Sequence, residues 1–292
     1  MIPAAFEYFA PKSLDEALRL VARHGDEAKL LAGGHSLLPL MKLRLSAPRY
    51  VVDIGRIRSL RSIREEGGRI VIGALATHHD VEASELLRIT CPLLPETAAE
   101  IGDVQVRNRG TVGGSLAHAD PAADYPAAIL ALDAEIVATS SSGTRVIPAA
   151  EYFVDLLTTQ LRPGEILTEV RIPRTGENSG AAYRKLHQPA SHFALAGAAA
   201  RVTLGPGEKI ESVAIGITGV AVNAYRATAA EQMLIGKKAA PKLLAEAAEK
   251  VTDGIDPLGD IHASAAYRRA AAAVYARRAL EAAIARAGGK KA

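Results

Sequence analysis

The chain has 292 residues, 49% of them hydrophobic and 23% charged, which is enough for one large domain or two to three smaller ones. Its net charge of +3 is too small, and too evenly spread, to indicate a nucleic-acid-binding protein. The single cysteine, Cys91, excludes an internal disulfide, a four-thiolate zinc site and an iron–sulfur cluster, and it indicates a reducing, cytoplasmic compartment. We expect no secretory signal and no transmembrane helix, and we interpret the basic end, GGKKA, as a solvated tail.

The first elements predict a small α/β unit that ends near residue 55. Ser13 and Glu16 form a capping box ahead of apolar residues at helical spacing, so a helix follows. A short strand over 28–32, a helical turn over 36–45 and a buried strand over 50–54 complete the unit.

The middle of the chain mixes hairpins with helices. Gly67 and Gly68 predict a hairpin over 62–76, and Gly143 predicts a second one over 134–150. The remaining predicted elements are a helix from a cap at Thr77, helices over 93–101 and 122–132, and a strand over 166–173.

A polar segment over 174–180, RTGENSG, is the best linker candidate. The pattern beyond it predicts strands over 181–186, 193–204 and 212–220, then helices over 227–236, 241–251 and 263–287. The mixture of hairpins, meander and helices indicates an α+β fold and not a doubly wound parallel sheet.

Two glycine pairs stand in the same format, each followed by a hydroxyl residue or His-Ser and then by apolar residues. They are Ala32-Gly33-Gly34-His35-Ser36 and Thr111-Val112-Gly113-Gly114-Ser115. Bare backbone of this kind can form an anion-binding concavity, and two such loops could hold one pyrophosphate; the alternative is a pair of tight turns. The chain has neither a G-x-G-x-x-G fingerprint nor a Walker motif, which disfavours a plain Rossmann domain and a P-loop NTPase.

Three segments resemble one known family. AGGHSLLPLMKLRL (32–45), RNRGTVGGSLAHADPAADYPAAILALDAEI (107–136) and DPLGDIHASAAYRRAAAAVYARRALEAA (256–283) are similar to the FAD-binding medium subunit of molybdenum hydroxylases. That family includes the carbon monoxide dehydrogenase medium chain and the flavin segment of xanthine dehydrogenase, and the resemblance extends over the whole chain.

The resemblance implies an α+β architecture with a two-subdomain, PCMH-type FAD-binding region, 1–56 and 57–175, which holds FAD between its parts. A C-terminal domain of antiparallel strands and helices, 178–287, follows. It also implies a small partner chain with [2Fe-2S] clusters and a large partner chain with the molybdenum cofactor, in a dimer of heterotrimers. The single cysteine agrees with clusters that lie on another chain.

The resemblance also implies a set of cofactor-binding residues and neither a metal site nor a catalytic residue. The set is Ala32, Gly33, Gly34, His35, Ser36, Ile101, Thr111, Val112, Gly113, Gly114, Ser115, Asp124, Leu161, Tyr183 and Lys185. The two loops are expected to bind the pyrophosphate through backbone N–H groups and hydroxyls. Relatives often carry Asn where this chain has Ser115, whose shorter side chain leaves that contact open.

Other members of the set have a structural alternative. Asp124 matches a carboxylate that bonds the cofactor's sugar or ribityl region, or it is a helix N-terminal charge. Ile101 and Leu161 match apolar contacts, or are core. Tyr183 and Lys185 lie two apart on a strand and share a face. Tyr183 could stack on the flavin and Lys185 could stabilise the reduced flavin anion. The alternative is a surface aromatic residue next to a solvated lysine.

Three further features need a separate interpretation. His35 serves its loop through its backbone and not through a covalent flavin link. The run His78-His79-Asp80 is a helix N-terminus, because adjacent helical side chains do not converge on a metal. Arg107 and Arg109 flank the second loop and could face phosphate or a partner.

The function expected from the resemblance is electron transfer through FAD, from [2Fe-2S] clusters on a partner to a terminal acceptor. The first alternative is a self-contained FAD-dependent oxidase or dehydrogenase of the same cofactor-binding fold, which the low aromatic content (4%) of the chain disfavours. The second is a scaffold without cofactor, which the two intact glycine pairs disfavour. The sequence leaves open the substrate and the acceptor.

Overall fold

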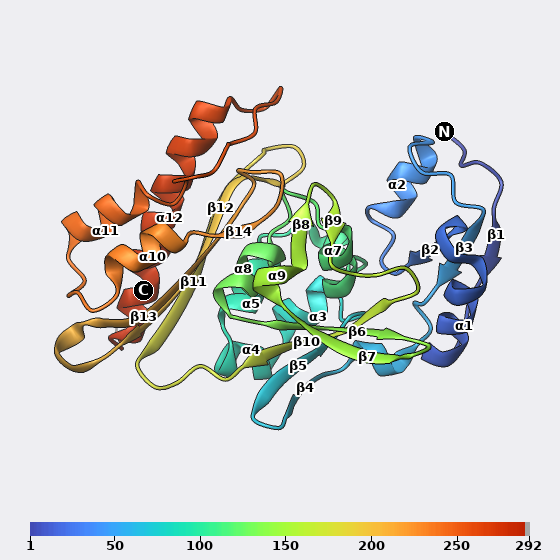
Figure 1. Ribbon diagram of the computed structural model, residues 1–292, viewed down its shortest axis with the longest axis horizontal. Coiled ribbons are helices and arrows are strands. Elements are labelled where there is room, and N and C mark those ends of the chain that lie inside the picture. The colour runs from blue at the N-terminus through green and yellow to red at the C-terminus, as the bar shows by residue number, and fades with distance from the viewer. Residues whose placement is uncertain (290–292) are drawn as a thin grey trace.

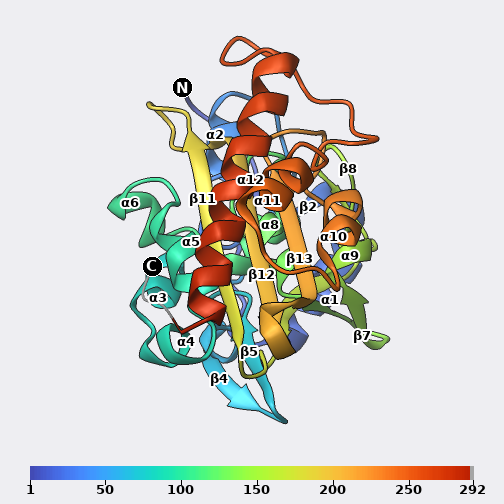
Figure 2. The ribbon, with the colours of Figure 1, turned by 90° about the vertical axis from the view of Figure 1, so that its left-hand side faces the viewer.

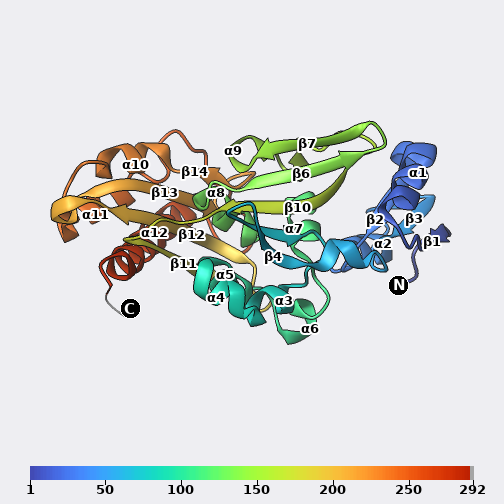
Figure 3. The ribbon, with the colours of Figure 1, turned by 90° about the horizontal axis from the view of Figure 1, so that it is seen from below.

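Three main β-sheets follow one another along the chain in the computed structural model, which describes residues 1–289 (Figure 1). The last three residues of the predicted solvated tail lie outside the described residues. The N-terminal unit lies at one end of the long axis and the C-terminal helices lie at the other, with the five-stranded sheet between them (Figures 1 and 3). No helix over 1–289 combines the length and the apolar character needed to cross a membrane.

The N-terminal unit is a parallel three-stranded sheet in the order β1-β3-β2. Ser13 caps its first helix as predicted and accepts a hydrogen bond from the N–H of Glu16 (3.2 Å), while the Glu16 carboxylate accepts one from the N–H of Lys12 (2.9 Å). Because parallel strands need crossover connections, the loop that leaves β2 emerges at the carboxyl end of the sheet. The elements are β1 (Glu7–Phe9), α1 (Leu14–His24), η1 (Gly25–Glu27), β2 (Ala28–Leu31), α2 (Leu37–Lys42) and β3 (Tyr50–Asp53).

The middle unit contains an antiparallel sheet in the order β4-β5-β10-β6-β7. Both predicted hairpins are present, with Gly67 and Gly68 at φ +58° and +73° between β4 and β5, and Gly143 at the start of β7. The predicted helix over 122–132 begins later, at Tyr125, because the Asp120 carboxylate first closes a turn on the N–H of Ala122 (2.9 Å).

The elements of the middle unit in chain order are η2 (Arg58–Arg61), β4 (Ile63–Glu66), β5 (Arg69–Gly73), α3 (His78–Ala83), α4 (Glu85–Thr90), α5 (Leu93–Ala99), α6 (Val104–Arg107), α7 (Val112–His118), α8 (Tyr125–Ala131), β6 (Glu135–Ser140), β7 (Gly143–Pro148), α9 (Ala149–Tyr152), β8 (Phe153–Asp155), β9 (Thr158–Thr159) and β10 (Ile166–Pro173). Among the strands of residues 1–289, β8 and β9 pair only with each other.

The C-terminal unit is an antiparallel sheet in the order β11-β12-β13-β14. Figure 2 shows α12 running across its outer face, while α8 of the middle unit packs against β12 and β13. The contact is close: a Cβ built on Gly216 would lie 2.8 Å from the carbonyl carbon of Ala127. The elements are β11 (Ser179–His187), β12 (Ala194–Leu204), η3 (Pro206–Glu208), β13 (Ile210–Thr218), β14 (Tyr225–Arg226), α10 (Thr228–Leu234), α11 (Pro241–Ala248) and α12 (Ala265–Ala287).

The α+β architecture expected from the sequence is confirmed, including the C-terminal domain of antiparallel strands and helices. Helix α8 belongs in sequence to the middle unit but is wedged against the C-terminal sheet. Its first turn, which begins after Asp124, is therefore fixed from two sides. This position places Asp124 where all three units approach one cavity.

Candidate functional site

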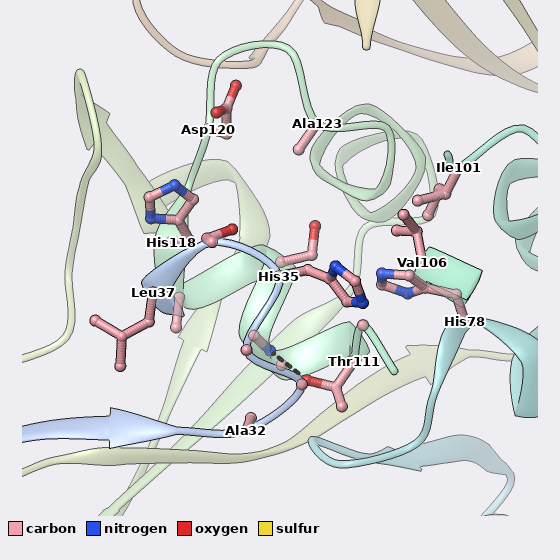
Figure 4. A pocket seen from close by; sticks show the side chains of 18 of the residues that line it. Ala32, His35, Leu37, His78, Ile101, Val106, Thr111, His118, Asp120 and Ala123 are labelled. Atoms are coloured by element: carbon pink, nitrogen blue, oxygen red, sulfur yellow. Dashed lines mark hydrogen bonds between the residues drawn. The ribbon is translucent and has the colours of Figure 1, made fainter. Parts of the chain in front are cut away.

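A cavity of about 580 Å³ lies where the loop after β2 faces the middle unit. This volume is within the range of pockets that hold small molecules and cofactors. Its wall is formed by segments far apart in the sequence, from the β2–α2 loop to the turn before β12 (Figure 4). They include residues 29–30, 32–37, 101–102, 110–111, 113–115, 117–118, 123–124 and 191–193.

The two glycine pairs lie side by side on this wall. A Cβ built on Gly33 would collide with the carbonyl oxygen of Arg109 and would lie 2.8 Å from the Cα of Gly110. A Cβ built on Gly114 would lie 3.9 Å from the Cβ of Ala32. The absence of a side chain at Gly33 thus allows the two loops to pack against each other. Glycine is needed at this position for that packing, in addition to any contact with a ligand.

The first loop presents free hydrogen-bond donors. Within residues 1–289 no group of the protein accepts a hydrogen bond from the N–H groups of residues 33–37, which we call the donor loop. Gly34 bends this loop with a φ of +82°, and the Ser36 hydroxyl makes no capping bond to α2. Consecutive free N–H groups on a cavity wall form a site for an anion.

The second glycine loop, residues 111–115, differs from this expectation. The N–H of Val112 donates to Ala76 O (3.0 Å) and that of Gly113 to Ala74 O (2.8 Å). The N–H groups of Gly114 and Ser115 donate to Thr111 Oγ1 (3.1 Å) and Thr111 O (3.0 Å), because α7 begins here and Thr111 caps it. The N–H groups of 112–115 are thus bonded within the protein, and this loop offers the cavity its hydroxyls.

Asp124 is held by both members of the predicted Tyr183–Lys185 pair. The Tyr183 hydroxyl donates to Asp124 Oδ1 (2.5 Å), and Lys185 Nζ lies 2.9 Å from the same oxygen. Lys185 also donates to the carbonyls of Glu100 (2.5 Å) and His192 (2.7 Å). Since an ammonium group has three donors, these partners account for all of them.

The three side chains of this cluster have different positions. Asp124 lines the cavity, and burial raises its pKa to about 6 despite the opposing effects of Lys185 and Tyr183. Tyr183 and Lys185 lie behind it, buried and away from the wall. The shared face of β11 is as predicted, but this face is buried between units and not at the surface.

The other predicted residues divide between the wall and the core. Ile101 lines the cavity, whereas Val112 belongs to the core of the middle unit and Leu161 packs against that core. Arg107 pairs with Glu82 (2.8 Å) and bonds the carbonyl of Ile101 (3.2 Å), so its charge is used inside the protein.

Several wall residues had no signal in the sequence. His192 and Phe193 come from a turn before β12, and Leu157 comes from the β8–β9 turn. His118 lies one turn after Ser115 on α7, a helical spacing that could have placed it on the same side.

His78 is also on the wall. The predicted helix N-terminus at Thr77 is present, with Thr77 and Asp80 forming a capping box. Nowhere in residues 1–289 do three His, Cys, Asp or Glu side chains gather closely enough to bind a metal ion. The ring of His78, however, points into the cavity, toward the ring of His35 (Figure 4).

Comparison with known proteins gives consistent matches over nearly the whole chain. Residues 4–175 match the family described as FAD binding domain in molybdopterin dehydrogenase, and residues 181–283 match the CO dehydrogenase flavoprotein C-terminal domain. The carbon monoxide dehydrogenase medium chain of Hydrogenophaga pseudoflava is 42% identical over 286 residues, 98% of this chain and 99% of the relative. The 6-hydroxypseudooxynicotine dehydrogenase complex subunit alpha of Paenarthrobacter nicotinovorans is 41% identical over 268 residues, 92% of this chain and 90% of the relative.

A solved structure of carbon monoxide dehydrogenase from Hydrogenophaga pseudoflava, in a form that lacks the Mo-pyranopterin moiety, superimposes with a TM-score of 0.95. It is 43% identical, and the match covers 98% of this chain and 99% of the solved chain.

Proposed function

The chain belongs to the family of FAD-binding domains of molybdopterin dehydrogenases, and from that premise we propose that it transfers electrons through FAD within a molybdenum hydroxylase complex. It is an oxidoreductase subunit whose own cofactor is FAD, and its place is that of the medium subunit. The observation that carries the electron-transfer proposal is the donor loop, 33–37, on the wall of a cavity of cofactor size.

The residues on the wall fit FAD. The donor loop would bond the negatively charged diphosphate, and the hydroxyls of Thr111 and Ser115 would add donors from the other side. Both buried bonds of Asp124 go to Oδ1, which leaves Oδ2 to accept a bond from a sugar or ribityl hydroxyl. Tyr183 and Lys185 would act through Asp124 and not by touching the flavin.

When bound, the flavin accepts two electrons and passes them on one or two at a time. The chain would orient the cofactor and limit its contact with water. Ile101, Leu157 and Phe193 are among the apolar residues of the wall, and Lys185 fixes the segments that carry Ile101 and Phe193 by bonding Glu100 O and His192 O. This function requires no acid–base pair from the chain.

The partner proposal follows from the cysteine content. Cys91 is the single cysteine of the chain, it is 3% exposed, and burial raises its thiol pKa to about 12. A buried protonated thiol is not a cluster ligand, which supports the proposal that the electrons come from [2Fe-2S] clusters on a small partner chain. A large chain with the molybdenum cofactor would complete the complex, as a dimer of heterotrimers.

We propose the domain limits 1–56, 57–175 and 178–287, which place each main sheet in its own domain. The cytoplasmic location stays a prediction. Relatives of this chain act, by their names, on carbon monoxide or on 6-hydroxypseudooxynicotine, which supports a substrate that is set outside this chain.

The test is to purify the chain with the chains that accompany it and record its absorption. We expect the spectrum of oxidised flavin, clusters and molybdenum on the accompanying chains, and reduction of the flavin by substrate only when those chains are present. A chain that takes up no FAD even with its partners would refute the proposal. Reduction of the isolated chain by a small organic substrate would instead support a self-contained oxidase.

A further inference from the structure

His78 stands where the two glycine loops meet. Its backbone N–H donates to the carbonyl of Gly110 (2.9 Å), and its ring occupies the place that a side chain at Gly110 would need: a Cβ built there would lie 2.7 Å from Cδ2 of the imidazole and closer still to Nε2. Gly110 in turn packs against Gly33 of the donor loop. The imidazole is therefore in contact with the junction of both loops.

The hydrogen-bonding groups of His78 are not satisfied by the protein. The side chain is 5% exposed, and its Nδ1 is buried without a partner. Nε2 likewise makes no hydrogen bond to any residue of 1–289, although His78 lines the cavity. Burying polar atoms without hydrogen-bond partners costs free energy. The arrangement is explained if a bound ligand is the hydrogen-bond partner of one of the two ring nitrogens.

The surroundings select a neutral ring with its proton on Nε2. Burial, with smaller effects from His35 and Arg107, lowers the pKa of His78 to about 4. A proton on Nδ1 would have no acceptor in its packed position, whereas a proton on Nε2 places the N–H group beside Gly110, at the junction of the two loops. The charge of Arg107 is already paired with Glu82, so it does not compete for the ligand.

We propose that His78 is an additional cofactor-binding residue, whose Nε2–H donates a hydrogen bond to a diphosphate oxygen of FAD. The inference rests on the proposed function, since it takes the cavity to be the FAD site. The diphosphate is the part of the cofactor that the loop junction would hold, and His78 is in contact with that junction.

The test measures binding by the full chain, in the form in which it is purified, after removal of its FAD. His78→Leu and His78→Phe remove the donor, His78→Gln keeps one at similar reach, and His79→Leu is a matched control because His79 is the exposed neighbour on α3. The ligands are FAD, ADP, which shares the diphosphate, and riboflavin, which lacks it. Thermal unfolding without ligand shows which variants fold.

We expect His78→Leu and His78→Phe to weaken FAD and ADP binding about ten-fold or more, the usual effect of losing a hydrogen bond to a charged group. His78→Gln should stay within about three-fold of the wild type by the same reasoning, riboflavin binding should not change, and His79→Leu should match the wild type. The inference fails if the two apolar variants bind FAD as the wild type does, if His78→Gln loses as much as His78→Leu, or if ADP binding is unaffected. Failure of the proposed function would look different, because the wild type itself would then not bind FAD.

Discussion

Gly33→Ala tests whether the contact between the two loops builds the site. The new methyl group would collide with the carbonyl oxygen of Arg109 and approach the Cα of Gly110 to 2.8 Å. Ordinary contact begins at 3.4 Å, and both obstacles are backbone atoms, which cannot rotate away as a flexible side chain can. The donor loop must therefore withdraw from the middle unit by roughly 0.6 Å or more.

The expected cost follows from the size of this shift. Overpacking by one methyl group destabilises a well-packed site by about 1–3 kcal/mol. In a chain of this length each kcal/mol lowers Tm by roughly 2–4 °C. The same shift lengthens every hydrogen bond from the donor loop to the diphosphate, so FAD affinity should fall about ten-fold, equivalent to about 1.4 kcal/mol.

The assay compares Gly33→Ala with Gly176→Ala, which makes the same chemical change at an exposed loop residue with no atom within 4 Å of the new Cβ. Tm without FAD and the Kd for FAD are measured for both variants. The control should keep both values of the wild type. Equal Tm and equal Kd in the two variants would show that the loops do not depend on their contact, and the reasoning would be refuted.

Three further results are expected. Lys185→Met leaves Asp124 buried without its cation, so it should destabilise the chain by about 3–5 kcal/mol. The loss should be larger at pH 8 than at pH 5, because the pKa of Asp124 is raised to about 6 and its carboxyl is protonated at pH 5. Denaturant titration at pH 5 and at pH 8 measures the difference. The pKa of His78 is lowered from 6.5 to about 4 in the folded chain, so between pH 6.5 and pH 4 the ring takes up a proton only in the unfolded chain. The wild type should therefore lose up to about 3 kcal/mol of stability relative to His78→Gln as the pH falls from 6.5 to 4. In hydrogen exchange, amides 33–37 should exchange fast without FAD and slowly with it, whereas amides 112–115 should be protected in both; equal protection without FAD would contradict the distinction between the loops.

Local patterns predicted the elements that depend on local chemistry. The helix after Ser13 and both hairpins were predictable because a capping hydroxyl and glycines with positive φ determine the backbone within a few residues. The three residues of β1 were not predictable, since Glu7 and Tyr8 are exposed and the segment becomes a strand only by pairing with β3. The β-propensity of a short segment predicts little when pairing with a strand far away in the sequence determines its structure.

The site shows the same division. The glycine loops were recognisable because their residue types serve the backbone directly. The surroundings of Lys185 were not, because its carbonyl partner at Glu100 lies 85 positions away and no local pattern joins the two. His78 was predicted correctly as the start of a helix, but the capping pattern describes its backbone and says nothing of a ring that reaches Gly110.

The unequal hydrogen bonding of the two loops has a structural cause. The second loop opens a helix that is bonded to Ala74 and Ala76 beside β5, so it is part of the rigid middle unit. The donor loop follows a short parallel strand of a separate small sheet and touches the middle unit through backbone at Gly33. A diphosphate bound to the donor loop and to the hydroxyls of Thr111 and Ser115 would therefore add a second link between two units that already share a hydrophobic cluster, in which Leu75 and Ile166 pack with residues of the N-terminal unit. Cofactor binding and the relative position of the N-terminal unit must then be coupled, since every bond from the donor loop to the ligand also holds the small sheet against the larger one.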